Sequence, residues 1–109
     1  ALPLAPKNAW LRIRLGELQR DAGDLERAAA LMGEAVALEP SSASYWNALG
    51  MVLGARGDLG EAEKAFRKAV GLDAVDARYA YNLGLALLRQ GKRAEAEPGT
   101  KAPHPFDNE

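Results

Sequence analysis

Residues 46–66 read WNALGMVLGARGDLGEAEKAF, and this stretch contains two helical patterns joined by a glycine. Trp46, Leu49 and Leu53 fall on one face of a first helix, because their spacing matches the helical period. A second apolar series has the same kind of spacing and comprises Leu59, Ala62, Ala65, Phe66, Ala69 and Val70. The stretch therefore predicts two consecutive amphipathic helices.

Gly57 and Asp58 lie between the two patterns. Glycine readily takes the left-handed backbone that ends a helix, and aspartate can cap the helix that follows. Glu63 and Arg67 are four residues apart on the second helix, which favours an ion pair between them. We therefore expect an antiparallel helix–turn–helix unit with its turn at Gly57.

The turn also contains the tripeptide Arg56-Gly57-Asp58, which serves elsewhere as a cell-adhesion ligand. Gly23 and Gly91 lie at equal intervals before and after Gly57 in the sequence, and neither belongs to such a tripeptide. Turn chemistry therefore explains the glycine better than adhesion does. A phosphate-binding loop is disfavoured as well, because it would need a preceding strand and a Gly-Lys-Ser/Thr sequence that opens a helix.

The pattern recurs at a constant interval along the chain. Leu-Gly pairs occupy residues 15–16, 49–50 and 83–84, and Asn8, Ser42 and Asp76, all suited to helix N-caps, keep the same interval. From this repeat we expect helices at about 9–21, 25–38, 43–56, 59–72 and 77–90.

The series Trp46-x-x-Leu49-Gly50-x-x-Leu53 followed by Ala62-x-x-x-Phe66 resembles the tetratricopeptide repeat, whose unit of about 34 residues matches the interval found here. The resemblance implies an all-α fold in which antiparallel helix pairs stack as a right-handed α-solenoid, here about two and a half units. The expected divisions are an irregular lead-in at 1–8, a repeat domain at 9–97 with units at 9–42, 43–76 and 77–97 (incomplete), and an irregular proline-rich tail at 98–109.

Composition limits the classes of function. The chain has 109 residues, 48% of them hydrophobic, and a net charge of −1, which predicts one soluble domain with no field to attract nucleic acid. No apolar run approaches the roughly 20 residues of a membrane helix, so we expect no membrane insertion. The N-terminus lacks signal-peptide features, which weakly favours the cytoplasm, and it lacks an initiator Met, so we expect a piece of a longer protein.

Residues suited to catalysis are scarce. The chain has no cysteine, and its one histidine, His104, lies in the tail beside prolines with no evident partner. Carboxylates alternate with Lys and Arg along the helices, as on a solvated surface. We therefore expect a non-enzymatic protein with no cofactor and no metal site.

The resemblance implies that the first helix of each unit lines a concave groove that binds a peptide or a partner helix. The groove residues expected from it are Trp10, Ile13, Glu17, Arg20, Asn47, Met51, Gly54, Arg78, Tyr81, Asn82, Leu85 and Arg89. The apolar members of this set could instead pack between adjacent helices. Family members that hold a chaperone's C-terminal carboxylates use Lys, Asn and Arg, whereas Ile13, Glu17 and Ala48 occupy three of those places here, so we expect no such clamp.

The third unit breaks off, because Pro98-Gly99 interrupts its second helix. We expect the first helix of this unit to lose its cover at Leu83, Leu87 and Leu88, a possible face for a homo-oligomer. Alternatively, the tail is foreign to the repeat. The functional alternatives to a protein-binding scaffold are a self-assembly module that uses this face and the regulatory arm of a larger enzyme.

Overall fold

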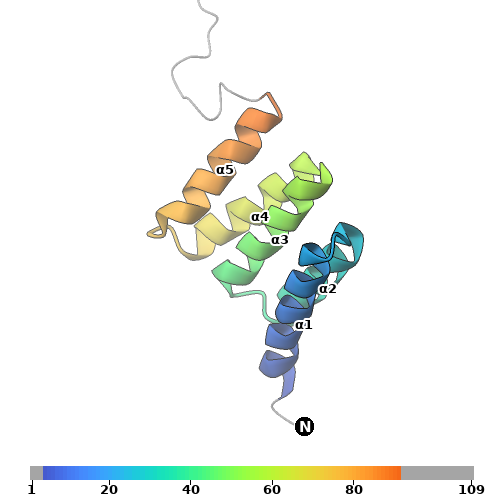
Figure 1. The fold of residues 1–109 in the computed structure, drawn as a ribbon. Helices are drawn as coiled ribbons and strands as arrows, with labels where there is room; N and C mark the ends of the chain where they lie inside the picture. The colour runs from blue at the N-terminus through green and yellow to red at the C-terminus, as the bar shows by residue number, and fades with distance from the viewer. Residues whose placement is uncertain (1–3, 92–109) are drawn as a thin grey trace, which may run out of the picture.

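The computed structural model describes the backbone of residues 4–91 and the side chains of residues 8–91. The described part of the chain forms five helices and no strand. They are α1 (Leu4–Asp21), α2 (Leu25–Leu38), α3 (Ala43–Arg56), α4 (Leu59–Leu72) and α5 (Ala77–Arg89). Figure 1 shows α1 paired with α2 and α3 paired with α4, while α5 packs against α4 at the far end from the N-terminus. The expected all-α solenoid of helix pairs is confirmed.

Three glycines end the first helices with the same backbone geometry. Gly23, Gly57 and Gly91 have φ of 93°, 94° and 81°, a left-handed conformation that side chains disfavour. Their equivalence confirms that the Arg56-Gly57-Asp58 tripeptide belongs to a repeated turn. Within it, Arg56 Nε lies 3.3 Å from Asp58 Oδ2.

Side-chain caps begin three of the helices. Asp24 accepts a hydrogen bond from Arg27 N, Ser42 from Tyr45 N and Asp76 from Arg78 N. Asp58 precedes α4 without such a bond, so the cap expected there is wrong. Its carboxylate pairs with Arg56 instead.

The first helix is longer than the sequence predicted. The irregular lead-in expected at 1–8 is wrong for residues 4–8, and Asn8 lies inside α1 rather than capping it. The proline at position 6 is tolerated because it lies in the first turn, where a backbone N–H has no carbonyl partner within the helix. The expected tail at 98–109, and the rest of the third unit beyond residue 91, lie outside the described residues.

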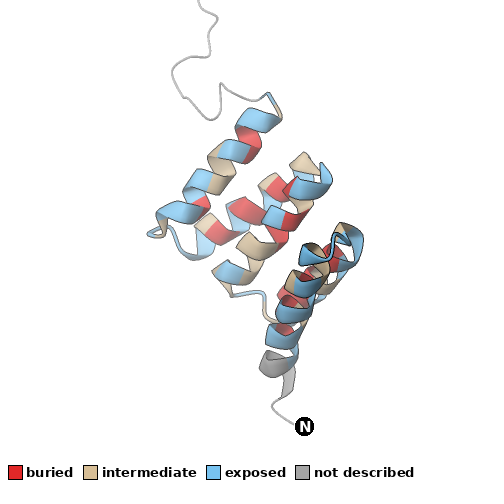
Figure 2. Ribbon diagram, viewed as in Figure 1, coloured by how far each residue is buried: buried red, intermediate tan, exposed pale blue. Residues whose placement is uncertain are grey.

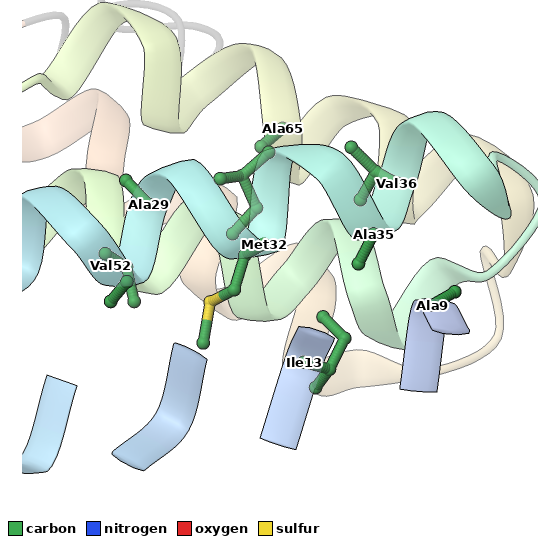
Figure 3. Packing of buried hydrophobic residues seen from close by; sticks show 10 residues of the cluster. Ala9, Ile13, Ala29, Met32, Ala35, Val36, Val52 and Ala65 are labelled. Atoms are coloured by element: carbon green, nitrogen blue, oxygen red, sulfur yellow. The ribbon is translucent and has the colours of Figure 1, made fainter. Parts of the chain in front are cut away.

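Most of the core lies inside unit one and at its contact with unit two. Met32, Val36 and Val52 are buried there with Ile13, and Figure 3 shows Met32 of α2 directed towards α1. A smaller cluster of Ala62, Phe66 and Ala86 joins α4 to α5. Figure 2 shows the buried residues on the faces where neighbouring helices meet. The core is therefore larger in units one and two than it is where α5 packs on α4.

In units one and two, the glycine of the Leu-Gly pair controls how closely the paired helices approach. A Cβ on Gly50 would lie 2.6 Å from Phe66 Cε1, and one on Gly16 would lie 2.9 Å from Met32 Cγ. Met32 and Phe66 occupy equivalent positions, one repeat apart. In units one and two, the large side chain of the second helix therefore packs directly on the backbone of the first.

Candidate functional site

The first helices of units two and three are linked by two polar contacts. Asn82 Nδ2 donates to Asn47 Oδ1 at 2.9 Å, and an Arg89 guanidinium nitrogen donates to the carbonyl of Gly54 at 3.2 Å. Both contacts join residues of α3 and α5 that are 35 positions apart in sequence. They hold the two helices at a defined separation along the surface that the repeat predicts to be concave.

A hollow of about 520 Å³ lies between these helices near the start of α5. Its walls combine exposed apolar side chains with amides, since Met51 is 48% exposed and Tyr81 is 67% exposed beside the two asparagines. The lining residues are Asn47, Met51, Ala77, Arg78, Tyr81 and Asn82.

A second, smaller hollow of about 120 Å³ continues the first, because Met51 and Asn82 line both. Leu85 and Arg89 of α5 contribute to it with Phe66 of α4. Its other lining residues are Gly54, Leu59, Ala62 and Ala86. We call the two hollows together the α3–α5 groove.

Arg78 is the cation nearest the start of α5, and it is already paired. Its Nε donates to Asp76 Oδ1 at 2.9 Å, and its backbone N–H donates to the same atom at 2.9 Å. The side-chain bond, assisted by the backbone bond, lowers the pKa of Asp76 to about 2 and raises the pKa of Arg78. A carboxylate entering this hollow must therefore compete with Asp76 for the guanidinium.

A peptide ending in Glu-Glu-Val-Asp tests the predicted absence of a carboxylate clamp. We expect no micromolar binding in isothermal titration, because Asp76 occupies Arg78 and the clamp positions Ile13, Glu17 and Ala48 carry no cation. A dissociation constant in the micromolar range that Arg78→Ala abolishes would contradict this prediction.

The groove residues expected on α1 do not line the α3–α5 groove. Trp10 is 55% exposed on α1 with the Arg14 guanidinium 5.7 Å from its ring centroid, and Glu17 pairs with Arg14 at 3.0 Å. Arg20 pairs with Asp21. None of these residues lines the α3–α5 groove. A role for them in binding stays a prediction.

The assignment of Ile13 to the groove is wrong. Its side chain is only 6% exposed and belongs to the core cluster between the first two units. Asn47 is its equivalent in unit two and is half-buried in the groove. An isoleucine at this repeat position is drawn into the core because burial of its side chain is favourable.

The expected uncovered face of the third unit is also wrong in part. Leu87 is 5% exposed, and Leu83 is half-buried against the cluster of α4 and α5. Leu88 remains 41% exposed. The three leucines therefore do not form one bare surface.

Sequence reasoning did not assign Phe66, Leu59 or Ala62 to the groove, since their spacing placed them in the core. They reach it because α4 lies behind the gap between α3 and α5, and so residues of a second helix form its floor. Gly54 was expected in the groove, and the small residue Ala86 was the further signal available, because both leave that floor accessible.

Residues 8–91 contain no group of three His, Cys, Asp or Glu side chains placed to hold a metal ion. No helix within the described residues is long and apolar enough to cross a membrane.

Comparison with protein families decides the classification. A tetratricopeptide repeat model matches residues 13–77 and again residues 48–100. The chain belongs to the tetratricopeptide repeat family. A search of curated proteins found no match for this tetratricopeptide repeat (TPR) chain.

Solved structures show the same TPR architecture. The crystal structure of MamA is 27% identical with a TM-score of 0.77, over 84% of this chain and 53% of MamA. YrrB, described as a TPR protein with an unusual peptide-binding site, is 28% identical with a TM-score of 0.70, over 80% of this chain and 45% of YrrB. The N-terminal domain of stress-induced protein-1 from C. elegans shares the fold. It is 22% identical with a TM-score of 0.78, over 87% of this chain and 80% of that domain. The chain thus spans about half the length of MamA and of YrrB.

Proposed function

We propose that this TPR chain is a non-catalytic protein-interaction module that binds a peptide or a partner helix in the α3–α5 groove. The observation that supports it most directly is the groove itself, where exposed Met51, Tyr81 and Leu85 flank a pair of asparagines. Apolar pockets with a few placed polar groups are typical of binding sites. YrrB, with its described peptide-binding site, has a similar fold.

The asparagine pair supplies polar groups for a peptide backbone. Asn82 Nδ2 donates to Asn47 Oδ1, and among the described residues no hydrogen bond occupies Asn82 Oδ1. Asn47 Nδ2 makes only a 3.6 Å contact with Met51 Sδ. A peptide backbone needs an acceptor for its N–H and a donor for its carbonyl. Asn82 Oδ1 is the free acceptor, and Asn47 Nδ2 is a donor with only a weak contact.

The apolar side chains supply anchoring surface. Tyr81 is the most exposed of them at 67%, and aromatic residues contribute strongly to binding because they are large and lose little conformational entropy. We therefore assign Tyr81 as the main anchor, with Met51 and Leu85 beside it.

A display library of random peptides, selected on the full chain, tests the proposal. We expect selected peptides to bind Tyr81→Ala at least about tenfold more weakly in isothermal titration, because truncating a well-packed aromatic anchor usually costs more than about 1.4 kcal/mol. Leu72→Ala is the matched control, since Leu72 is 43% exposed outside the groove. Peptides that bind Tyr81→Ala and Leu85→Ala as tightly as the parent chain would place binding elsewhere.

A further inference from the structure

Helix α1 carries three exposed leucines in one line. Leu11, Leu15 and Leu18 are 47%, 40% and 62% exposed, and their spacing of four and three residues places them on a single stripe. Ala9 and Ile13, which α1 contributes to the core, lie on another side of the helix. We call the three residues the α1 leucine stripe.

The repeat shows what this stripe does in the other units. The equivalent residues of unit two are Tyr45, Leu49 and Val52, and those of unit three are Tyr79, Leu83 and Ala86. Leu49 and Val52 are buried in the cluster shared with α2, and Tyr45 packs against it. Tyr79 and Ala86 are 4% and 3% exposed, and Leu83 packs against the cluster of α4. The same stripe is therefore a packing surface in two units and is exposed in the first.

None of the described helices is available to cover the stripe. In these units α2 is packed between α1 and α3, and α4 between α3 and α5. The other end of the described chain presents α5, which is also the first helix of its unit. Head-to-tail stacking of the described helices alone would therefore bring two first helices together, without the second helix that covers the equivalent stripes.

The stripe is instead complementary to itself. Leucines at alternating spacings of four and three residues form the seam along which two helices pack as a coiled coil. With the two α1 helices antiparallel, Leu15 of one copy packs against Leu18 of the other, and the same contact repeats across the two-fold axis. Such an isologous contact closes as a dimer.

The charges beside the stripe favour the antiparallel direction. Arg14 and Asp21 are seven residues apart and lie on the same side of the stripe. In the antiparallel arrangement Arg14 of one copy lies beside Asp21 of the other, and the two-fold axis repeats this pair. A parallel arrangement would place Arg14 beside the neutral Gln19 instead.

We propose that two copies of this chain form a two-fold symmetric dimer through the α1 leucine stripe, with their α1 helices antiparallel. This surface is separate from the α3–α5 groove, so the dimer and the peptide site can be tested independently. Each dimer would carry two grooves.

Sedimentation velocity of the full chain over a range of micromolar concentrations tests the dimer. We expect a concentration-dependent dimer, and at least about tenfold weaker association for Leu15→Glu and for Leu18→Glu, because each places a charge in the apolar seam. Leu72→Glu is the matched control, since Leu72 is 43% exposed against 40% for Leu15, and it should leave the dimer intact. Circular dichroism of each variant checks that it stays helical.

A charge exchange tests the direction. Asp21→Arg should weaken the dimer by placing like charges together, and Arg14→Asp combined with Asp21→Arg should restore it. A monomer at every concentration would overturn the proposal. So would a dimer that Leu18→Glu leaves unchanged, or one that only Leu88→Glu dissociates. An Asp21→Arg variant that dimerises like the parent would overturn the antiparallel arrangement.

Discussion

Phe66→Ala is expected to lower the free energy of unfolding by about 3–5 kcal/mol. The ring is 5% exposed, lies against the backbone at Gly50 and belongs to the cluster that joins α4 to α5. Its removal leaves a cavity at the contact between units two and three, which partial relaxation does not fill. Urea unfolding followed by circular dichroism measures the change.

The control for this variant is Val75→Ala, because Val75 is 92% exposed in the turn before α5. It should alter stability by no more than about 0.5 kcal/mol. A Phe66→Ala variant that unfolds within about 1 kcal/mol of the parent, an ordinary effect for any substitution, would show that the cluster of α4 and α5 contributes little, contrary to its burial.

Gly50→Ala is the second change with a large expected effect, about 1–3 kcal/mol of destabilisation. An alanine in a helix interior normally gains about 1 kcal/mol over glycine. Here the new Cβ would lie 2.6 Å from Phe66 Cε1 and 2.7 Å from Cδ1, so the buried ring must move. Overpacking therefore outweighs the gain in helix propensity.

Gly84→Ala is the matched control, since Gly84 occupies the same position one repeat later. No described residue lies within 4 Å of the Cβ that an alanine would add there. This variant should be stabilised by up to about 1 kcal/mol, and the midpoints of urea unfolding should move in opposite directions for the two changes. Shifts of the same sign would show that the Phe66 contact does not decide the effect.

The repeat explains why the helices and turns could be predicted from the sequence. Gly23, Gly57 and Gly91 recur at one interval. Each follows the C-terminal end of a first helix, and its ability to take a positive φ fixes the turn there. Helices α2 to α4 have the expected bounds, and α5 ends one residue earlier than expected. The start of α1 was missed because Asn8 keeps the interval of the N-caps Ser42 and Asp76 but does not cap α1, and a proline in a first turn does not stop a helix.

The site was predicted less completely, because burial depends on neighbours that the repeat does not specify. Ile13 and Asn47 are equivalent in sequence, yet one is in the core and the other in the groove. Asp58 and Asp24 are equivalent too, but only Asp24 caps, since Arg56 attracts the carboxylate of Asp58. The exposure of the α1 leucine stripe follows from packing alone, and so periodicity could not distinguish it from its buried counterparts.

The small cluster between α4 and α5 has a consequence for the binding that we propose at the α3–α5 groove. Ala62, Phe66 and Ala86 are its buried members, a smaller set than the core of units one and two. We therefore expect α5 to open more readily than the helices of those units, and one wall of the groove belongs to α5. A ligand that touches both α3 and α5 binds only molecules in which α5 is docked, and part of its interaction energy goes into shifting that population. The affinity of the proposed site therefore depends on residues outside it. A substitution that stabilises the packing of α5 on α4 would strengthen binding without contacting the ligand.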